Sequence, residues 1–333
     1  MTVLQQSPPF DARTFADAIR SGDRRSLARA ITLVESGRAD HRVQAQALLA
    51  ALGSARQALR IGLSGTPGVG KSTFIEAFGL MLTRQGLRVA VLAVDPSSVR
   101  SGGSILGDKT RMEQLARAPL AFIRPSPNQT QLGGVARRTR EAVALCEAAG
   151  FDVVLIETVG VGQSETVVAH VCDIFLLLLA PAGGDELQGV KRGIMEMADM
   201  IVVNKADGDL RAAALRTCSD YAGALHLLRR RAQDPAGYPR AMVASAVDRT
   251  GLDQVWGDLR VLADWRQVQG HWAARRAEQA RHWFGEEVRL GLLAALVRDP
   301  VRGMMAELGD AVAAGRMTPE AAAALVLGQV TGV

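Results

Sequence analysis

The sequence predicts an α/β protein with a mostly parallel sheet flanked by helices and with helical extensions at both ends. Between Arg60 and Ala246, short β-branched or leucine-rich runs alternate with helix-sized segments, which favours a parallel sheet. Outside that stretch, apolar residues recur at three- and four-residue steps, as they do in amphipathic helices. We therefore expect an N-terminal helical segment at 1–58, a central domain at 59–250 and a C-terminal helical segment at 251–333.

Composition excludes several classes of protein. The chain has 39 Lys and Arg against 34 Asp and Glu, interleaved along its length, so a net charge of +5 does not predict a nucleic-acid partner. The three cysteines lack metal-ligand spacing and indicate reduced thiols. Residues 1–10 show no signal-peptide pattern, and apolar runs such as 174–180 are too short to cross a membrane. We expect a cytoplasmic protein without a membrane partner.

The elements can be placed in chain order. Helices are expected from residue 11 to about 58. Strands are expected at 61–64, 89–94, 121–123, 153–156, 174–179, 201–203 and 241–244. From Leu252 to about Arg298 the pattern favours one long helix that glycines can bend or break, and Thr318-Pro319 begins a last helix. On a continuous helix Trp265, Trp272 and Trp283 would share one face, which leaves two interpretations open: internal packing or a subunit interface.

A phosphate-binding loop follows the first expected strand. The sequence GTPGVGKS matches G-x-x-x-x-G-K-S/T and lies between that strand and a helix beginning near Ser72. The glycines let backbone N–H groups surround phosphate oxygens, Lys71 reaches the β- and γ-phosphates, and the Ser72 hydroxyl takes a magnesium position. A dinucleotide-binding fold is disfavoured because Thr73 stands where its third glycine would be. The expected nucleotide-binding residues here are Gly65, Gly68, Val69, Gly70, Lys71, Ser72 and Thr73.

The strand at 153–156 ends in Glu157-Thr158-Val159-Gly160, where a γ-phosphate sensor is expected. We expect Glu157 to act through a magnesium-bound water or to position the attacking water. Asp95 and Asp108 are further candidate magnesium ligands beside Ser72, because one or two carboxylates satisfy this ion.

The residue after Gly160 is Val161, where Ras-like enzymes place a water-orienting glutamine. We therefore expect slow basal turnover that a partner or a second subunit accelerates. Lys71, Glu157 and Gly160 are the catalytic candidates that follow from these motifs.

A base-reading loop follows the strand at 201–203. Asn204-Lys205-Ala206-Asp207 is an N-K-x-D pattern, in which Asp207 accepts hydrogen bonds from guanine, Asn204 supports the loop and N7, and the Lys205 stem covers the base. Ser245-Ala246, after the last strand, fits the remaining backbone contact to the base oxygen. The motifs together predict a GTPase that binds GTP or GDP with Mg²⁺.

The whole set resembles the methylmalonyl-CoA mutase-associated GTPases of the MeaB/ArgK type, which are relatives of the nickel-insertion GTPases. The resemblance spans about residues 11 to 330. It depends on these strings: the phosphate loop, Asp95-Pro96-Ser97-Ser98, GGSILGDKTRM at 102–112, Arg124-Pro125-Ser126, Gly133-Gly134-Val135, ETVGVGQSE at 157–165, GDELQG at 184–189 and Asn204 to Asp207.

The resemblance implies a homodimeric P-loop GTPase that binds an adenosylcobalamin-dependent acyl-CoA mutase, with methylmalonyl-CoA mutase as the first candidate. By the same analogy, GTP binding and hydrolysis gate cobalamin loading and protect the mutase as a chaperone would. The C-terminal helices would supply the dimer contact, and Lys191, in the loop 183–191, would belong to a further catalytic switch.

Three alternatives stay open. A nickel-insertion GTPase would be expected to carry clustered histidines or cysteines, whereas these residues are scattered here. A kinase acting on a periplasmic amino-acid-binding protein would need a substrate base and a docking groove. A nucleotide-dependent binding module with negligible turnover is compatible with Val161. The sequence does not identify which acyl-CoA mutase is the client, nor any direct contact with cobalamin.

Overall fold

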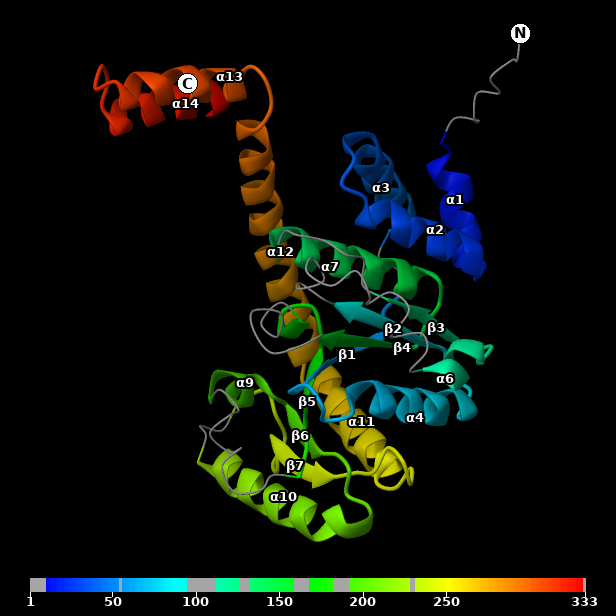
Figure 1. Ribbon diagram of the computed structural model, residues 1–333. Coiled ribbons are helices and arrows are strands. Elements are labelled where there is room, and N and C mark those ends of the chain that lie inside the picture. Colours follow the sequence, from blue (N-terminus) through cyan, green and yellow to red (C-terminus); the bar gives the residue numbers. More distant parts are fainter. Residues whose placement is uncertain are drawn as a thin grey trace. The chain divides into compact units, whose positions relative to one another are not determined.

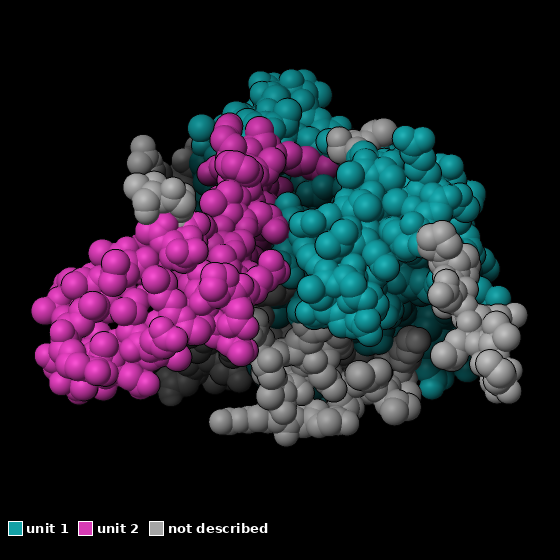
Figure 2. Space-filling model, turned by 90° about the horizontal axis from the view of Figure 1, so that it is seen from above, with its two compact units in different colours: residues 1–275 teal, residues 276–333 magenta. Residues whose placement is uncertain are grey.

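The computed structural model describes residues 10–53, 56–94, 112–125, 132–158, 168–181, 192–227 and 231–331. It divides into two compact units, residues 1–275 and residues 276–333, which are described separately (Figure 2). The boundary falls inside the helix α12 (His271–Leu296).

A seven-stranded sheet forms the centre of the first unit, in the order β3-β2-β4-β1-β5-β6-β7 (Figure 1). Every pairing between these strands is parallel, which confirms the predicted fold class. The strands are β1 (Leu59–Ser64), β2 (Val89–Val94), β3 (Ala121–Arg124), β4 (Val153–Thr158), β5 (Ile174–Leu179), β6 (Met200–Val203) and β7 (Arg240–Val243). Because all run in one direction, the loops after them meet along a single edge of the sheet.

Helices cover both faces of the sheet, as the uniformly apolar central strands require (Figure 1). The flanking helices are α4 (Lys71–Arg84), α6 (Glu113–Arg117), α7 (Leu132–Ala148), α9 (Arg192–Met197), α10 (Arg211–His226) and α11 (Leu252–Val268). On one face Phe74 stacks on Phe78 with ring centroids 5.4 Å apart, and Phe78 meets Trp256 of α11 edge-on at 6.2 Å. This apolar cluster fixes α4, and with it the loop that precedes α4, against the strands.

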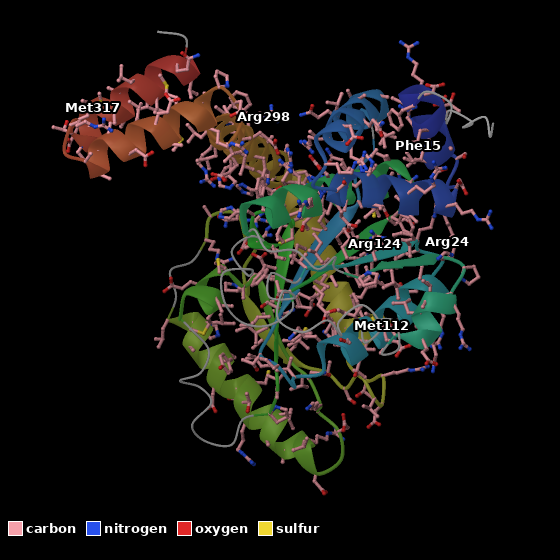
Figure 3. All side chains as sticks on the ribbon, turned by 45° about the horizontal axis from the view of Figure 1, so that its top comes forward. Phe15, Arg24, Met112, Arg124, Arg298 and Met317 are labelled. Atoms are coloured by element: carbon pink, nitrogen blue, oxygen red, sulfur yellow. The ribbon has the colours of Figure 1, made fainter. Side chains whose placement is uncertain are left out.

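Three helices precede the sheet: α1 (Ala12–Arg20), α2 (Arg24–Glu35) and α3 (Ala39–Leu52). Aspartate side chains cap the first two, with Asp11 and Asp23 each accepting two backbone N–H groups. Arg24 donates to the carbonyls of Pro119 and Ala121 at the edge strand β3, and Arg124 at the end of β3 pairs with Glu35 of α2 (Figure 3). These two arginine contacts join α2 to the edge strand β3.

The C-terminal part is helical but not continuous. α11 ends at Val268, and Gly270, with φ +76°, separates it from α12, so the expected long helix from Leu252 is two helices. The separation also removes the continuous helix on which the three tryptophans would have aligned; Trp272 instead donates from Nε1 to Gln57 at 3.2 Å. α13 (Val301–Ala313) and α14 (Pro319–Thr331) complete the second unit.

The last helix begins where the sequence predicts. Thr318 Oγ1 accepts the Ala321 N–H at 3.3 Å, and Pro319 is the first helical residue. Among the described residues, no helix is both long and apolar enough to cross a membrane.

Candidate nucleotide-binding site

The phosphate loop connects the central strand β1 to α4. Gly68 and Gly70 both have φ +86°, a left-handed conformation that glycine adopts without steric cost. At Gly65 the constraint is close packing, because a Cβ there would lie 2.3 Å from the Leu178 carbonyl oxygen of β5. The buried Val69 holds the loop against the core. Glycine is therefore required at Gly68 and Gly70 for its backbone conformation, and at Gly65 because there is no room for a side chain.

The polar side chains of the loop lie at the first turn of α4. Lys71 Nζ donates to the backbone carbonyl oxygens of Gly65 at 2.7 Å and Thr66 at 3.3 Å, so its ammonium lies over the loop. Ser72 is half-buried and Thr73 is exposed. The positive end of the α4 dipole and the loop N–H groups favour an anion here.

The strand beside β1 delivers a carboxylate to the same edge. β4 pairs with β1 up to Leu63 and Glu157, and the Glu157 residue is 4% exposed. β4 extends two residues beyond the expected 153–156, through Thr158. Thr158 is fully buried, and its Oγ1 donates to Ser64 Oγ at 3.0 Å.

Four predicted site residues lie outside the described residues: Asp95, Asp108, Gly160 and Lys191. They stay predictions from the sequence.

Asn204, directly after β6, joins the base loop to the phosphate loop. It is 1% exposed; its Nδ2 donates to the Val69 carbonyl at 3.0 Å, and its Oδ1 accepts the Ala246 N–H at 3.2 Å. The sequence predicts a backbone contact from Ser245-Ala246 to the base oxygen, and that contact stays a prediction. One side chain therefore ties three loops together at the carboxyl edge of the sheet.

Lys205 has φ +59°, and its Nζ donates to the Gly68 carbonyl at 2.7 Å. This bond lays the lysine stem between the base loop and the phosphate loop. A flat apolar stem in that position can cover one face of a bound base.

Ser245 has a side-chain role that the sequence does not indicate. Its hydroxyl donates to Asp207 Oδ2 and accepts the Asp248 N–H at 3.0 Å, while its backbone bridges to Thr250. These contacts orient the Asp207 carboxylate. The only sequence signal is the position of Ser-Ala after the last strand, which predicts a backbone contact alone.

A buried ionic network lies at the opposite end of the sheet, before β5 and β6. Arg266 of α11 donates to the carboxylates of Asp199 and Asp234 at 2.6 Å each and to the Asp173 carbonyl at 2.9 Å. Burial alone would raise the pKa of Asp199. The charge and hydrogen bond of Arg266 lower the pKa by more than burial raises it, so the pKa lies below its ordinary value. The network holds α11 against the sheet whose opposite edge carries the site.

A phosphate loop after the central strand, with an N-K-x-D loop two strands away and bonded to it, defines a GTPase of the P-loop class. The family model described as "Methylmalonyl Co-A mutase-associated GTPase MeaB" matches residues 27–300, and the chain belongs to this family.

Individual relatives agree with that assignment. The chain is 48% identical over 318 residues to the mouse (Mus musculus) "Methylmalonic aciduria type A homolog, mitochondrial", covering 92% of this chain and 76% of the relative. It is 49% identical over 278 residues to "GTPase ArgK" of Escherichia coli K12, covering 82% of this chain and 83% of that protein. The crystal structure of a protein named "LAO/AO transport system kinase" has a TM-score of 0.72 and 37% identity, covering 96% of this chain and 97% of that one.

Proposed function

We propose that this GTPase is a chaperone for an adenosylcobalamin-dependent acyl-CoA mutase, with methylmalonyl-CoA mutase as the first candidate client. GTP binding and hydrolysis would gate cofactor loading and protect the mutase. The observation that carries the proposal is a phosphate loop and a guanine loop joined through Asn204, in a chain whose match to the mutase-associated family spans residues 27–300. The name of the mouse relative supports the same client class.

Guanine selection follows from the oriented Asp207 carboxylate. Guanine offers its N1–H and its exocyclic amine as adjacent donors, and a carboxylate fixed by Ser245 accepts both. Adenine lacks that donor pair, so its binding would leave the carboxylate without partners, which costs about 1–3 kcal/mol or more.

Magnesium fits the oxygen donors at the carboxyl edge of the sheet. The Ser72 hydroxyl is at the first turn of α4, and the buried Glu157 carboxylate ends the neighbouring strand. Ser72 would hold the ion directly and Glu157 directly or through water, with Asp95 and Asp108 as further candidate ligands. When bound, the ion neutralises charge that develops on the phosphate oxygens.

Hydrolysis by the isolated chain is proposed to be slow. Lys71 would stabilise charge on the γ-phosphate, and Glu157 with Gly160 would sense it, but Val161 supplies no group to orient water. The client would complete the site by shifting the population of a competent conformation, with Lys191 in a segment that responds to nucleotide and partner.

A second copy of the chain is the proposed partner of the C-terminal helices. Phe284, Val288 and Leu292 recur at four-residue spacing on α12 and are 73%, 48% and 50% exposed. Large apolar side chains in a stripe along one helix favour association through that stripe. Phe284→Glu should shift a dimer to monomer in light scattering, whereas Glu287→Gln on the same helix should not.

The test is release of inorganic phosphate from GTP by the full chain, with and without an adenosylcobalamin-dependent mutase from the same cell. Lys71→Ala is the blank. Stimulation by the mutase that the blank abolishes would support the proposal, and no stimulation would contradict the client assignment. Transfer of the γ-phosphate to an amino-acid-binding protein would favour a kinase instead, the activity for which the structurally similar transport system kinase is named.

A further inference from the structure

Two buried hydroxyl groups meet where β1 and β4 reach the nucleotide edge. Ser64 is the last residue of β1 and Thr158 the last of β4, and both are 0% exposed. Thr158 Oγ1 donates to Ser64 Oγ at 3.0 Å and has a second, longer contact to the Leu63 carbonyl oxygen of β1 at 3.4 Å. Ser64 immediately precedes Gly65 of the phosphate loop, and Thr158 immediately follows Glu157. The contact thus lies between the two motifs that are expected to act on the γ-phosphate.

The backbone pairing shows what this contact adds. The ladder between β1 and β4 ends at the pair Leu63 and Glu157. One residue further on, Ser64 pairs with β5 and Thr158 pairs with β2. The backbone ladder between β1 and β4 therefore does not include Ser64 and Thr158 as a pair. The hydroxyl bond continues the connection between the two strands by one more step, at the point where β1 becomes the phosphate loop.

Packing alone does not require hydroxyl groups at these positions. Alanine and valine have nearly the same shapes as serine and threonine, and most residues of the two strands are apolar. A buried hydroxyl is favourable only when a hydrogen bond replaces its lost hydration. The pair therefore supplies a directional contact that an apolar pair of the same size would not.

We propose that Ser64 and Thr158 are positioning residues for GTP hydrolysis, whose hydroxyl contact sets the phosphate loop relative to Glu157. The inference rests on the proposed GTPase function and deepens it. A shift of Ser64 would move Gly65, whose carbonyl accepts from Lys71 Nζ at 2.7 Å. Transition-state stabilisation is sensitive to small displacements of such groups, whereas ground-state binding of a diphosphate by loop N–H groups is less so.

The test compares Thr158→Val with Thr158→Ser in the full chain, measuring single-turnover hydrolysis at saturating GTP and the affinity for GDP. Thr139→Val is the matched control, because the Thr139 side chain is also mostly buried but its hydroxyl donates to Val135 O of its own helix at 2.9 Å. Thr158→Val should slow hydrolysis about tenfold, because misplaced catalytic groups lose transition-state stabilisation. The affinity for GDP should stay within about twofold of the wild-type value, since the loop contacts that bind the ground state are retained.

Thr158→Ser should restore most of the rate, and Thr139→Val should leave both readouts unchanged. Adding Ser64→Ala to Thr158→Val should slow the reaction no further, because Thr158→Val has already removed the contact that Ser64→Ala removes. The inference is overturned if Thr158→Val is as fast as wild type, if Thr158→Ser is as slow as Thr158→Val, or if the rate and GDP affinity fall in parallel. A wild-type chain that hydrolyses no GTP, either alone or with the mutase, would refute the proposed function itself, a separate outcome.

Discussion

Replacing Asp207 with asparagine is predicted to exchange guanine for xanthine as the preferred base. In the wild-type chain the Ser245 hydroxyl bonds Asp207 Oδ2, so the carboxylate is held in one orientation toward the base. Asparagine would keep one acceptor for N1–H but turn an NH₂ group toward the guanine amine. Xanthine carries a carbonyl at that position and would accept from the same NH₂ group.

The magnitude follows from the bonds involved. Losing one charge-assisted hydrogen bond costs about 1.5–3 kcal/mol. The asparagine NH₂ group and the guanine amine would also face each other as two donors, and both would lose hydration without gaining an acceptor. A total of about 3 kcal/mol corresponds to roughly a hundredfold weaker binding of GDP.

Isothermal titration of Asp207→Asn with GDP and with xanthosine diphosphate measures the exchange. Asp209→Asn, an exposed carboxylate two residues further along the chain, is the matched control and should bind GDP as wild type does. A GDP affinity of Asp207→Asn within about threefold of wild type, or an equal loss in Asp209→Asn, would refute the assignment of Asp207 as the base-reading group.

Three further predictions concern the phosphate loop, the buried ionic network around Arg266 and the cysteine thiols. Gly65→Ala should abolish nucleotide binding while the chain stays folded, as titration and circular dichroism would show, because a Cβ would lie 2.3 Å from a strand carbonyl. Arg266→Met should lower the free energy of unfolding by about 3–5 kcal/mol in urea denaturation, because the buried carboxylates of Asp199 and Asp234 lose their ion pairs with Arg266 and keep those with Arg231. Since the folded-state pKa of Asp199 is lowered, its contribution to the wild-type free energy of unfolding should be full above about pH 4 and be lost as the pH falls further. Burial raises the pKa of Cys172 to about 12, so at about pH 8 iodoacetamide should label Cys172 only after unfolding, whereas the half-buried Cys218 should react in the folded chain.

The order of elements in the central domain can be predicted because local sequence decides it. Strand-sized apolar runs such as Val89 to Val94 are buried on both faces, and the turns after them carry glycine, proline or polar residues. The phosphate and base loops are recognisable because their chemistry requires particular residue types at fixed spacing.

Contacts between distant segments cannot be read in the same way. Nothing in the local sequence places Ser64 beside Thr158, or Asn204 beside Val69, because both contacts arise from the strand order that tertiary packing selects. The break in the C-terminal helix is one of several that the sequence allows, since four glycines are candidates and only backbone geometry identifies Gly270.

The central claim is that nucleotide state and client binding are coupled, and thermodynamic linkage makes the coupling measurable from the nucleotide side. The measurement is the affinity of the full chain for a non-hydrolysable GTP analogue, titrated with and without saturating adenosylcobalamin-dependent mutase. We predict a change of about five- to 150-fold, the range typical of allosteric coupling. Equal affinities under the two conditions, with binding of the mutase verified in the same samples, would contradict the claim.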